Sequence, residues 1–316
     1  MWRSRWRPIL AWVSAGSWSA WALVRLTGAD RLPGFAVLAV PPLSLTPYVA
    51  AAAPLPILVA ASLRQWRATV LAGVAAAGLA VAVLPRALPA GQPHAAGPNL
   101  KVLAANLMFS QADPQRVVDL VRRTGADLLS VEEFTQDAAD EFDRRGLTAM
   151  LPYHVLDARW GPDGSGLYSR YPLRALPPQP GAGMSMPNAE VTLPGGRRVL
   201  VTVVHPLPPI KNQYGSWHHD LTGLPSPAPG EVRLLLGDFN ATLDHWLLRS
   251  ILGRGYADAA DQTGHGLVPS WGVSMYGPPL TIDHLLADRR CAIRRYEAYD
   301  LPGSDHQAVF AALQLP

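Results

Sequence analysis

Polar side chains that could do chemistry recur where the expected strands of residues 99–316 end or begin. Gly237-Asp238-Phe239-Asn240 follows the apolar run 231–236, and in an extended backbone Asp238 and Asn240 leave the same face. Similar positions are held by Asn106, Glu133, His205, Asp283 with His284, and Asp305 with His306. Each one alone could be a turn or a cap. The series as a whole predicts a catalytic site at one rim of a sheet.

The residue types indicate the kind of reaction. Carboxylate and amide oxygens are ligands that suit Mg²⁺, with Mn²⁺ as the alternative, and histidines can stabilise a phosphate or carry a proton. The sequence has no CxxC, HExxH, P-loop or G-x-S-x-G pattern. Its single cysteine, Cys291, excludes an internal disulfide. These features favour metal-dependent phosphate chemistry over a zinc protease or a serine hydrolase.

Short apolar runs that alternate with helical patterns predict the elements that position these residues. We expect strands at 100–106, 126–131, 153–157, 166–169, 189–193, 198–204, 231–236, 281–287 and 307–313, and helices from residue 113, over 135–145 and over 244–253. Pro194-Gly195-Gly196 predicts a hairpin. Strands outnumber helices, so the expected fold class is α+β, a two-sheet β-sandwich flanked by helices.

The first third of the chain has a different composition. Residues 1–98 hold eight arginines and one acidic residue, whereas residues 99–316 hold 19 basic and 23 acidic residues. Uncharged runs at 8–24, 32–63 and 68–85 approach or exceed the roughly 20 residues that a helix needs to cross a bilayer. We expect residues 1–85 to form an all-α membrane region with three transmembrane helices, the second kinked by its prolines. Residues 86–98, rich in Pro, Ala and Gly, are expected to be a linker.

Two alternatives exist for the membrane region. The first run could be a cleaved signal peptide, and the second could be a hairpin of two short spans, which would move the C-terminal domain to the other side of the membrane. Six of the ten tryptophans lie in this region, several where an interfacial belt would be. Arginines 3, 5, 7, 64 and 67 favour a cytoplasmic N-terminus and hence an extracellular domain.

The order of the motifs resembles that of the endonuclease/exonuclease/phosphatase superfamily over residues 99–316. The motifs are Asn106, Glu132-Glu133, Gly166-Leu-Tyr-Ser-Arg170, His205, Gly237-Asp238-Phe239-Asn240, Ile282-Asp283-His284 and Ser304-Asp305-His306. With the apolar N-terminus and His205-Pro-Leu-Pro-Pro209, the chain looks most like VanJ-type membrane phosphohydrolases, which are linked to teicoplanin resistance. The resemblance implies a DNase I-like fold.

The resemblance also implies a role for each residue. It makes Glu133 the main metal carboxylate, with Asn106 and Asp305 also at the metal. Asp238 and Asn240 would orient water and phosphate, and His205 would contact a phosphate oxygen. His306, aligned by Asp283, would be the general base or stabilise the phosphate. Two points stay open: Glu132 could replace Glu133 as ligand, and Trp271 could contact substrate or be a core aromatic.

The leading hypothesis is a multi-pass, membrane-anchored phosphohydrolase that acts on a lipid-linked phosphate or diphosphate at the outer face. The resemblance suggests undecaprenyl diphosphate, a cell-wall lipid carrier, and hence glycopeptide tolerance. The alternatives are an extracellular-facing endonuclease and a phospholipase or sphingomyelinase-like phosphodiesterase. The mildly acidic domain argues against nucleic acid as partner. Membrane lipids are the expected surroundings, and the sequence carries no signal of an oligomeric state.

This topology gives the first prediction. A reporter that is active only outside the cytoplasm, fused after Pro316, should be active, because an odd number of spans puts the two ends of the chain on opposite sides. The same reporter fused after Arg64 should be inactive. A reporter that is inactive after Pro316 and active after Arg64 would contradict the prediction.

Overall fold

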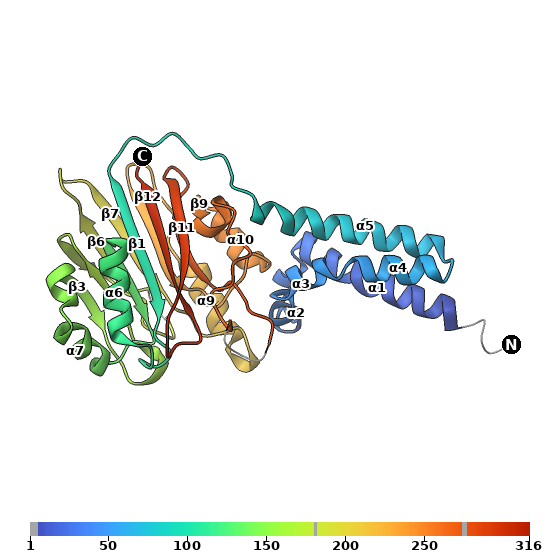
Figure 1. Ribbon diagram of the computed structural model, residues 1–316, viewed down its shortest axis with the longest axis horizontal. Helices are drawn as coiled ribbons and strands as arrows, with labels where there is room; N and C mark the ends of the chain where they lie inside the picture. The colour runs from blue at the N-terminus through green and yellow to red at the C-terminus, as the bar shows by residue number, and fades with distance from the viewer. Residues whose placement is uncertain (1–5, 180–181, 274–276) are drawn as a thin grey trace.

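Two six-stranded sheets face each other and carry the polar strand ends (Figure 1). The computed structural model describes residues 6–179, 182–273 and 277–316. One sheet has the order β11 (Ala292–Asp300), β12 (Gln307–Gln314), β1 (Asn99–Asn106), β2 (Leu128–Glu132), β4 (Ser165–Ser169), β3 (Tyr153–Asp157). The other has the order β5 (Leu173–Leu176), β6 (Asn188–Thr192), β7 (Arg198–Val204), β8 (Val232–Asp238), β10 (Asp283–Asp288), β9 (Tyr256–Asp258).

Three apolar layers hold the sandwich together. Buried side chains such as Val102, Val201 and Leu234 fill the space between the sheets. The first sheet is covered by α6 (Pro114–Thr124), α7 (Gln136–Arg144) and α8 (Leu147–Met150), and the second by α9 (Tyr214–Gly223) and α10 (Trp246–Gly253). A short helix, α11 (Ala259–Gln262), precedes β10. The predicted fold class, a two-sheet sandwich flanked by helices, is confirmed.

The elements missed from the sequence lie mainly at the sheet edges. The predicted ranges 153–157 and 198–204 coincide with β3 and β7, and the Pro-Gly-Gly turn joins antiparallel β6 and β7. Edge strand β11 was not predicted, since its outer face carries Arg294, Arg295 and Glu297 and gives no alternation of buried residues. Edge strands are often charged in this way because charge discourages pairing with another chain.

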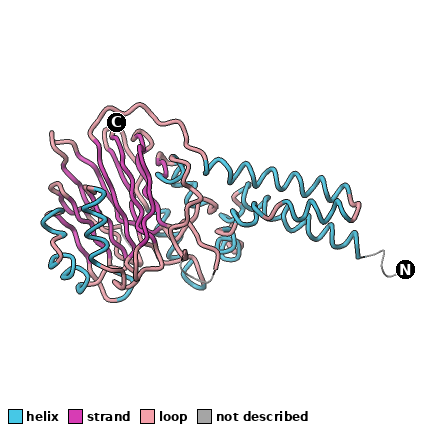
Figure 2. Tube along the Cα trace, viewed as in Figure 1, coloured by secondary structure: helices cyan, strands magenta, loops and turns pink. Residues whose placement is uncertain are grey.

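A bundle of helices projects from one side of the sandwich (Figures 1 and 2). Helices α1 (Trp6–Thr27), α4 (Pro54–Ser62) and α5 (Trp66–Val83) pack against one another through buried alanines. Small side chains let helices approach closely, as is common in membrane bundles. The outer surface carries exposed apolar side chains: Ile9, Val13, Leu23, Leu58, Val74 and Val81. Such a surface needs a partner or a lipid environment.

Only part of the three-span prediction is supported by helix length and hydropathy. Among the described residues one helix, Trp66–Ala87, is long and apolar enough to cross a membrane. The segments Ala36–Leu43 and Thr46–Ser62 qualify as a second only if the pair, bent by 64°, counts as one span. The predicted kink in the second run is therefore present. Helix α1 does not meet the same test, and Arg3 and Arg5 lie outside the described residues.

Two tryptophans of α1 face protein rather than an interfacial belt. The indole of Trp18 donates to the carbonyl of Val49 at 3.0 Å, and that of Trp21 donates to Thr46 Oγ1 at 3.1 Å. Both acceptors belong to α3 (Thr46–Ala51), the short helix beside the sandwich. These hydrogen bonds fix α1 against α3.

A buried ion cluster joins the helices to the sandwich. Asp244, in the loop after β8, binds Arg25 at 2.5 Å and Arg86 at 2.6 and 2.8 Å. Arg25 lies at the end of α1 and Arg86 in the 3₁₀ turn η3 (Leu84–Ala87). Burial opposes the charge of the carboxylate, but Arg86 and Arg25 outweigh it and lower the pKa of Asp244. The bundle is thus tied to the sandwich at the loop after β8.

The chain between α1 and α3 also docks on the sandwich. It contains η2 (Ala29–Arg31) and α2 (Ala36–Leu43), and Asp30 accepts the backbone N–H of Trp246 at 2.7 Å. Ala36 and Val40 of α2 belong to the apolar layer beneath α9 and α10. Helix α2 ends at a bend that we call the elbow, residues 40–45.

The elbow is held by a histidine of the sandwich. Proline has no N–H, so Pro41 and Pro42 weaken the helix, and the N–H of Ser44 bonds Pro42 instead of Val40. His245 Nε2 donates to the Val40 carbonyl at 2.8 Å, while its Nδ1 accepts the N–H of Thr242 at 3.0 Å. Burial lowers the pKa of His245 to about 4. The ring is therefore neutral, as this donor and acceptor pair requires.

The expected linker lies on the sandwich along much of its length. Pro89 forms a bridge with Thr263, and Ala90 N–H bonds Gln262. The Gln92 side chain donates to Gln262 and accepts from the N–H of Ile293. At the start of this segment, Arg86 is buried in the ion cluster. The segment therefore has defined contacts even though its composition is that of a linker.

The ion cluster gives the second prediction. Asp244→Asn should lower the free energy of unfolding of the full chain in detergent by about 3–5 kcal/mol, because it leaves buried arginines without a counter-charge. The depressed pKa stabilises the fold above the unfolded value of roughly 4, and this stabilisation is lost as pH falls through the lower folded value. Thermal unfolding between pH 3 and 7 measures both effects.

The matched control is Asp157→Asn. Asp157 pairs with Arg159 at the surface, where both side chains are nearly half exposed. Such a pair contributes about 1 kcal/mol or less. An equal loss of unfolding free energy in the two variants would contradict a special role for Asp244.

Candidate active site

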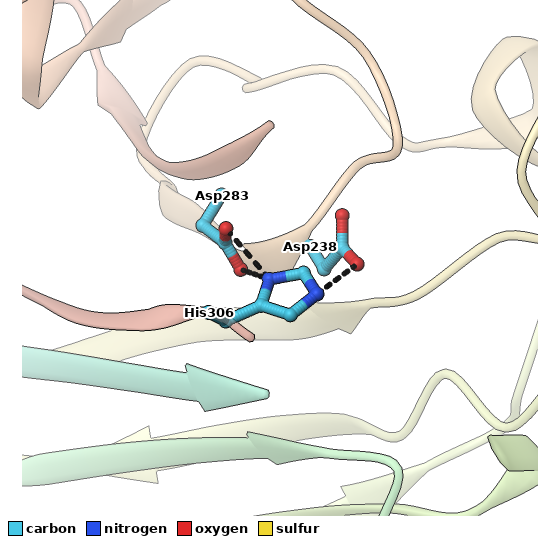
Figure 3. A group of neighbouring side chains, drawn as sticks. All are labelled: Asp238, Asp283 and His306. Atoms are coloured by element: carbon cyan, nitrogen blue, oxygen red, sulfur yellow. Dashed lines mark hydrogen bonds and ion pairs between the residues drawn. The ribbon is translucent and has the colours of Figure 1, made fainter. Parts of the chain in front are cut away.

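Two neighbouring strands and one loop bring an acid–base group together. Asp238 ends β8 and Asp283 begins β10, and the two residues lie opposite each other in the antiparallel pair. His306 directly precedes β12, and its Nδ1 lies 3.0 and 3.1 Å from the Asp283 oxygens (Figure 3). Its Nε2 lies 3.8 Å from Asp238 Oδ2. Sequence positions far apart thus form one contiguous group.

The charges of this group depend on one another. Burial opposes a charged imidazole, but Asp283, Asp238 and Asp305 outweigh it and raise the pKa of His306 to about 10. Burial, together with the nearby Asp283 carboxylate, raises the pKa of Asp238. His306 is therefore a cation at neutral pH, with Nδ1–H donated to Asp283 and Nε2–H free to face a ligand. Of its two suggested roles, phosphate stabilisation fits this state better than general base.

A serine that the sequence did not single out holds Asp283. Ser270 Oγ donates to Asp283 Oδ2 at 2.7 Å and accepts the N–H groups of Ile282 and Asp283 at 3.0 and 2.9 Å. Ser270 is fully buried. The only sequence feature that pointed to Ser270 was its position beside Trp271. Nothing in the sequence indicates that Ser270 contacts Asp283. It fixes the carboxylate that orients His306.

Glu133 and Asn106 lie beside Asp238 on the neighbouring sheet. Asn106 Nδ2 donates to Glu133 Oε1 and to Asp238 Oδ2, both at 3.2 Å. Glu133 Oε2 accepts the N–H of Phe109 at 2.9 Å. The Asn106 amide oxygen accepts the N–H of Met108 at 3.0 Å, so the amide NH2 group, not its oxygen, faces the two carboxylates. In this conformation Asn106 holds the two carboxylates together.

The two neighbouring glutamates have different surroundings. Glu133 has a left-handed backbone, φ 53°, and lines the cavity. Glu132 is fully buried, accepts from Ser130 Oγ at 2.5 Å and packs against Gly237. Burial raises the pKa of Glu132 well above its usual value and that of Glu133 to a lesser degree. Glu133, rather than Glu132, is placed to meet a cation or substrate.

His205 and Asn240 line the same cavity. Burial and the nearby His306 lower the pKa of His205 to about 3, so this ring is neutral. Its Nε2 lies 3.9 Å from Glu133 Oε1, and its buried Nδ1 has no hydrogen-bond partner in the described part of the chain. Asn240 has φ 46°, donates its backbone N–H to Asp238 at 2.8 Å and its amide to Pro206 at 3.0 Å.

Trp271 and Asp305 are joined by a hydrogen bond. Trp271 Nε1 donates to Asp305 Oδ2 at 2.8 Å, and Asp305 Oδ1 lies 3.8 Å from His306 Nε2. Both residues line the cavity, and Trp271 is only partly buried. The tryptophan thus orients a site carboxylate and presents its ring to the cavity.

The cavity that contains these residues has a volume of about 570 Å³. The site carboxylates and histidines form its base, and its walls include Pro41 and Ser44 of the elbow, Met184, Leu207 and Ile210. None of the described residues that line it is lysine or arginine. The lining therefore combines acidic and polar side chains with a largely apolar set.

The donor set fits a divalent cation. Glu133, Asp238 and Asp305 gather at the base of the cavity, and burial raises the pKa of Glu133 and Asp238 there, as expected of carboxylates that lack enough positive charge nearby. Oxygen ligands of this kind suit Mg²⁺ or Mn²⁺. A second set, Asp238, Asp283 and His306, also has ligand atoms within 4.8 Å of one another. In that set Asp283 already binds His306 and Ser270. Glu133 and Asp305 are therefore better candidates than Asp283 as metal ligands.

The arrangement suits attack of water on a phosphorus centre. Asp238 can accept a proton from the water, and the backbone of Asn240 holds the Asp238 carboxylate in place. Cationic His306 can stabilise the charge that develops on phosphate oxygens, and the neutral ring of His205, whose Nε2 lies near Glu133, can contact another. A bound dication would supply further neutralisation of that charge.

Comparison with known proteins agrees with this arrangement. Residues 103–306 match the endonuclease/exonuclease/phosphatase family, and the chain belongs to that family. Its members are hydrolases of phosphoester bonds and generally depend on divalent metals. No curated protein matches the chain.

Several solved structures have the same fold. An endonuclease/exonuclease/phosphatase from Beutenbergia cavernae DSM 12333 has a TM-score of 0.55 at 16% identity, over 69% of this chain and 72% of that one. D. rerio TDP2 complexed with single-strand DNA product has 0.54 at 14%, over 68% and 98%. A conserved protein from Enterococcus faecalis V583 has 0.52 at 15%, over 69% and 100%. At these identities the likeness establishes the DNase I-like fold alone.

The acid–base group gives the third prediction. His306→Ala should lower kcat for phosphoester hydrolysis by about 10²- to 10³-fold, the usual cost of removing one donor that stabilises developing charge. Ser270→Ala should lower kcat by about 10-fold with little change in KM, because Asp283 loses its hydrogen bond but keeps its charge. Steady-state kinetics on a chromogenic phosphodiester measures both effects.

Ser169→Ala is the matched control. Ser169 is a buried serine at the last position of β4. It pairs with the first residue of β2, whereas Glu132, at the site, is the last residue of β2. An equal loss of kcat in Ser169→Ala would show that Ser270 acts only through stability.

Proposed function

We propose that the protein is a membrane-anchored, metal-dependent phosphohydrolase that acts on a lipid-linked phosphate or diphosphate. The observation that carries the proposal is the composition of the cavity wall. Pro41 and Ser44, from the helical region, line the same cavity as Asp238 and His306. A substrate in this site therefore contacts the helical region as well as the catalytic residues.

The surface of the helical region supports membrane anchoring. Its outer face exposes aliphatic side chains, and helix Trp66–Ala87 is long and apolar enough to cross a bilayer. The described arginines 7, 64 and 67 lie at the end of the bundle away from the sandwich, as the course of α1, α4 and α5 places them (Figure 1). With three passes, this arrangement agrees with the positive-inside rule and an extracellular catalytic domain.

The electrostatics of the cavity favour a small anionic headgroup over a nucleic acid. A groove for a polynucleotide normally offers several lysines or arginines along the phosphate backbone. The described lining of this cavity offers none, and its apolar wall suits the hydrocarbon part of an amphiphile. The resemblance to VanJ-type phosphohydrolases points to undecaprenyl diphosphate, and turnover of that carrier would give tolerance to glycopeptides.

A substrate panel tests the proposal. The full chain in phospholipid vesicles with Mg²⁺ or Mn²⁺ should release phosphate from undecaprenyl diphosphate faster than it hydrolyses phosphatidyl lipids, sphingomyelin or plasmid DNA. Chelation should abolish the activity and added metal should restore it. Glu133→Gln should lower the rate by about 10²-fold or more, because it removes a charged ligand from the metal site.

The control for Glu133→Gln is Glu141→Gln. Glu141 lies on α7 and pairs with Arg144 and Arg145 on the outside of the sandwich. Its replacement should leave the rate within about twofold of the wild type, since surface pairs contribute little. Nicking of plasmid DNA without phosphate release from any lipid would replace the proposal by a nuclease.

A further inference from the structure

A second cavity adjoins the catalytic one, between the helices and the sandwich. It has a volume of about 420 Å³, and Ser44 and Leu280 line both cavities. The elbow and the loop that carries Leu280 therefore form the common boundary. The second cavity lies beside the first and is lined in part by the helices of the bundle.

The lining of this second cavity is mainly apolar. Pro47, Ala50 and Ala51 contribute from α3 and its end, and Ala80, Val83 and Leu84 from α5 and the turn that follows it. The sandwich contributes Leu243, Leu267, Pro279 and Leu280. The small side chains of the alanines leave the space open between the two helices and the domain.

The charged groups at one end of this cavity are already neutralised. Arg86 and Asp244 are part of its lining, and they bind each other in the buried ion cluster. They offer no unpaired charge to a ligand. The cavity is therefore suited to hydrocarbon and not to a second polar headgroup.

The opening of the cavity is framed by exposed side chains. Tyr48 is 43% exposed and donates its hydroxyl to the Pro279 carbonyl at 2.6 Å, which joins α3 to the sandwich. Leu84 and Leu267 are also exposed on the rim. An exposed apolar rim beside helices of this composition is placed where lipid chains would be.

We propose that this cavity binds the hydrocarbon chain of the substrate while its phosphate lies among Asp238, His205 and His306. The inference rests on the proposed function and adds which residues recognise the chain. The two cavities adjoin at Ser44 and Leu280, and this selects the occupant, since a single amphiphile has a headgroup for one cavity and a chain for the other. The elbow then lies at the junction between headgroup and chain.

Chain-length dependence tests the inference. The full chain in detergent is assayed with isopentenyl and geranylgeranyl diphosphate, which share a headgroup and differ in chain length. Ala80→Trp on α5 and Ala51→Trp on α3 should raise KM for the long substrate by about tenfold or more, since each buried methylene contributes about fourfold to affinity. Both variants should hydrolyse the short substrate at the wild-type rate, which also shows that they fold.

Ala77→Trp is the matched control. Ala77 is exposed on α5, nearly one turn before Ala80, and does not line the cavity. Its kinetics should equal the wild type with both substrates. The cavity does not bind the chain if the Trp variants of Ala80 and Ala51 leave KM unchanged for both substrates. The same holds if they raise KM equally for the short and the long substrate.

A binding experiment separates this inference from the proposed function. A long prenyl monophosphate with a diazirine at the chain end is crosslinked to the full chain, and the labelled peptides are identified. Labelling of α3 and α5 that is lost in Ala80→Trp and kept in Ala77→Trp supports the chain site even if no diphosphate is hydrolysed. Labelling that Ala80→Trp leaves unchanged overturns it even if diphosphate is hydrolysed.

Discussion

The cost of burying several carboxylates in one cleft determines how the catalytic residues are arranged. Asp238, Asp283 and Glu133 approach one another where the two sheets meet, and like charges in a dry site are unfavourable unless other groups offset them. His306 supplies positive charge, Asn106 bridges two of the carboxylates, and Ser270 satisfies the third. The balance of formal charge remains negative, which is the physical reason that the site fits a dication.

The same constraint explains the different states of the histidines. His306 is surrounded by carboxylates and becomes a cation, whereas His205 is buried close to that cation and stays neutral. His245 is also neutral and uses both ring nitrogens to hold the elbow. These three buried imidazoles thus differ in charge or in hydrogen-bond partners because their neighbours differ. Residue type alone could not have separated them.

What could be predicted from the sequence was local. Apolar runs and the turns after them located most of the strands, and the polar residues at their ends pointed to the rim where the cavity lies. The resemblance implied one contact between distant segments, that of His306 with Asp283, and the structure contains it. Other contacts between segments far apart in the chain could not be predicted. Ser270 with Asp283, His245 with Val40, and Asp244 with Arg25 and Arg86 have no local signal, since each partner alone has the composition of an ordinary loop or helix end.

The prolines of the second apolar run have a structural consequence that hydropathy does not express. A straight helix over residues 36–62 would leave the sandwich without Pro41 and Ser44 at its cavity. The break turns α2 onto the sandwich and frees the Val40 carbonyl, which His245 binds. The apolar helix α2 and the polar site then meet along one short boundary, at the elbow. The chain of an amphiphile bound across this boundary would contribute binding energy far from the reacting phosphate. Binding energy of this kind raises the rate of the chemical step only where it also positions the phosphate. The rigid ties at Val40 and Asp244 are what would let chain binding do so.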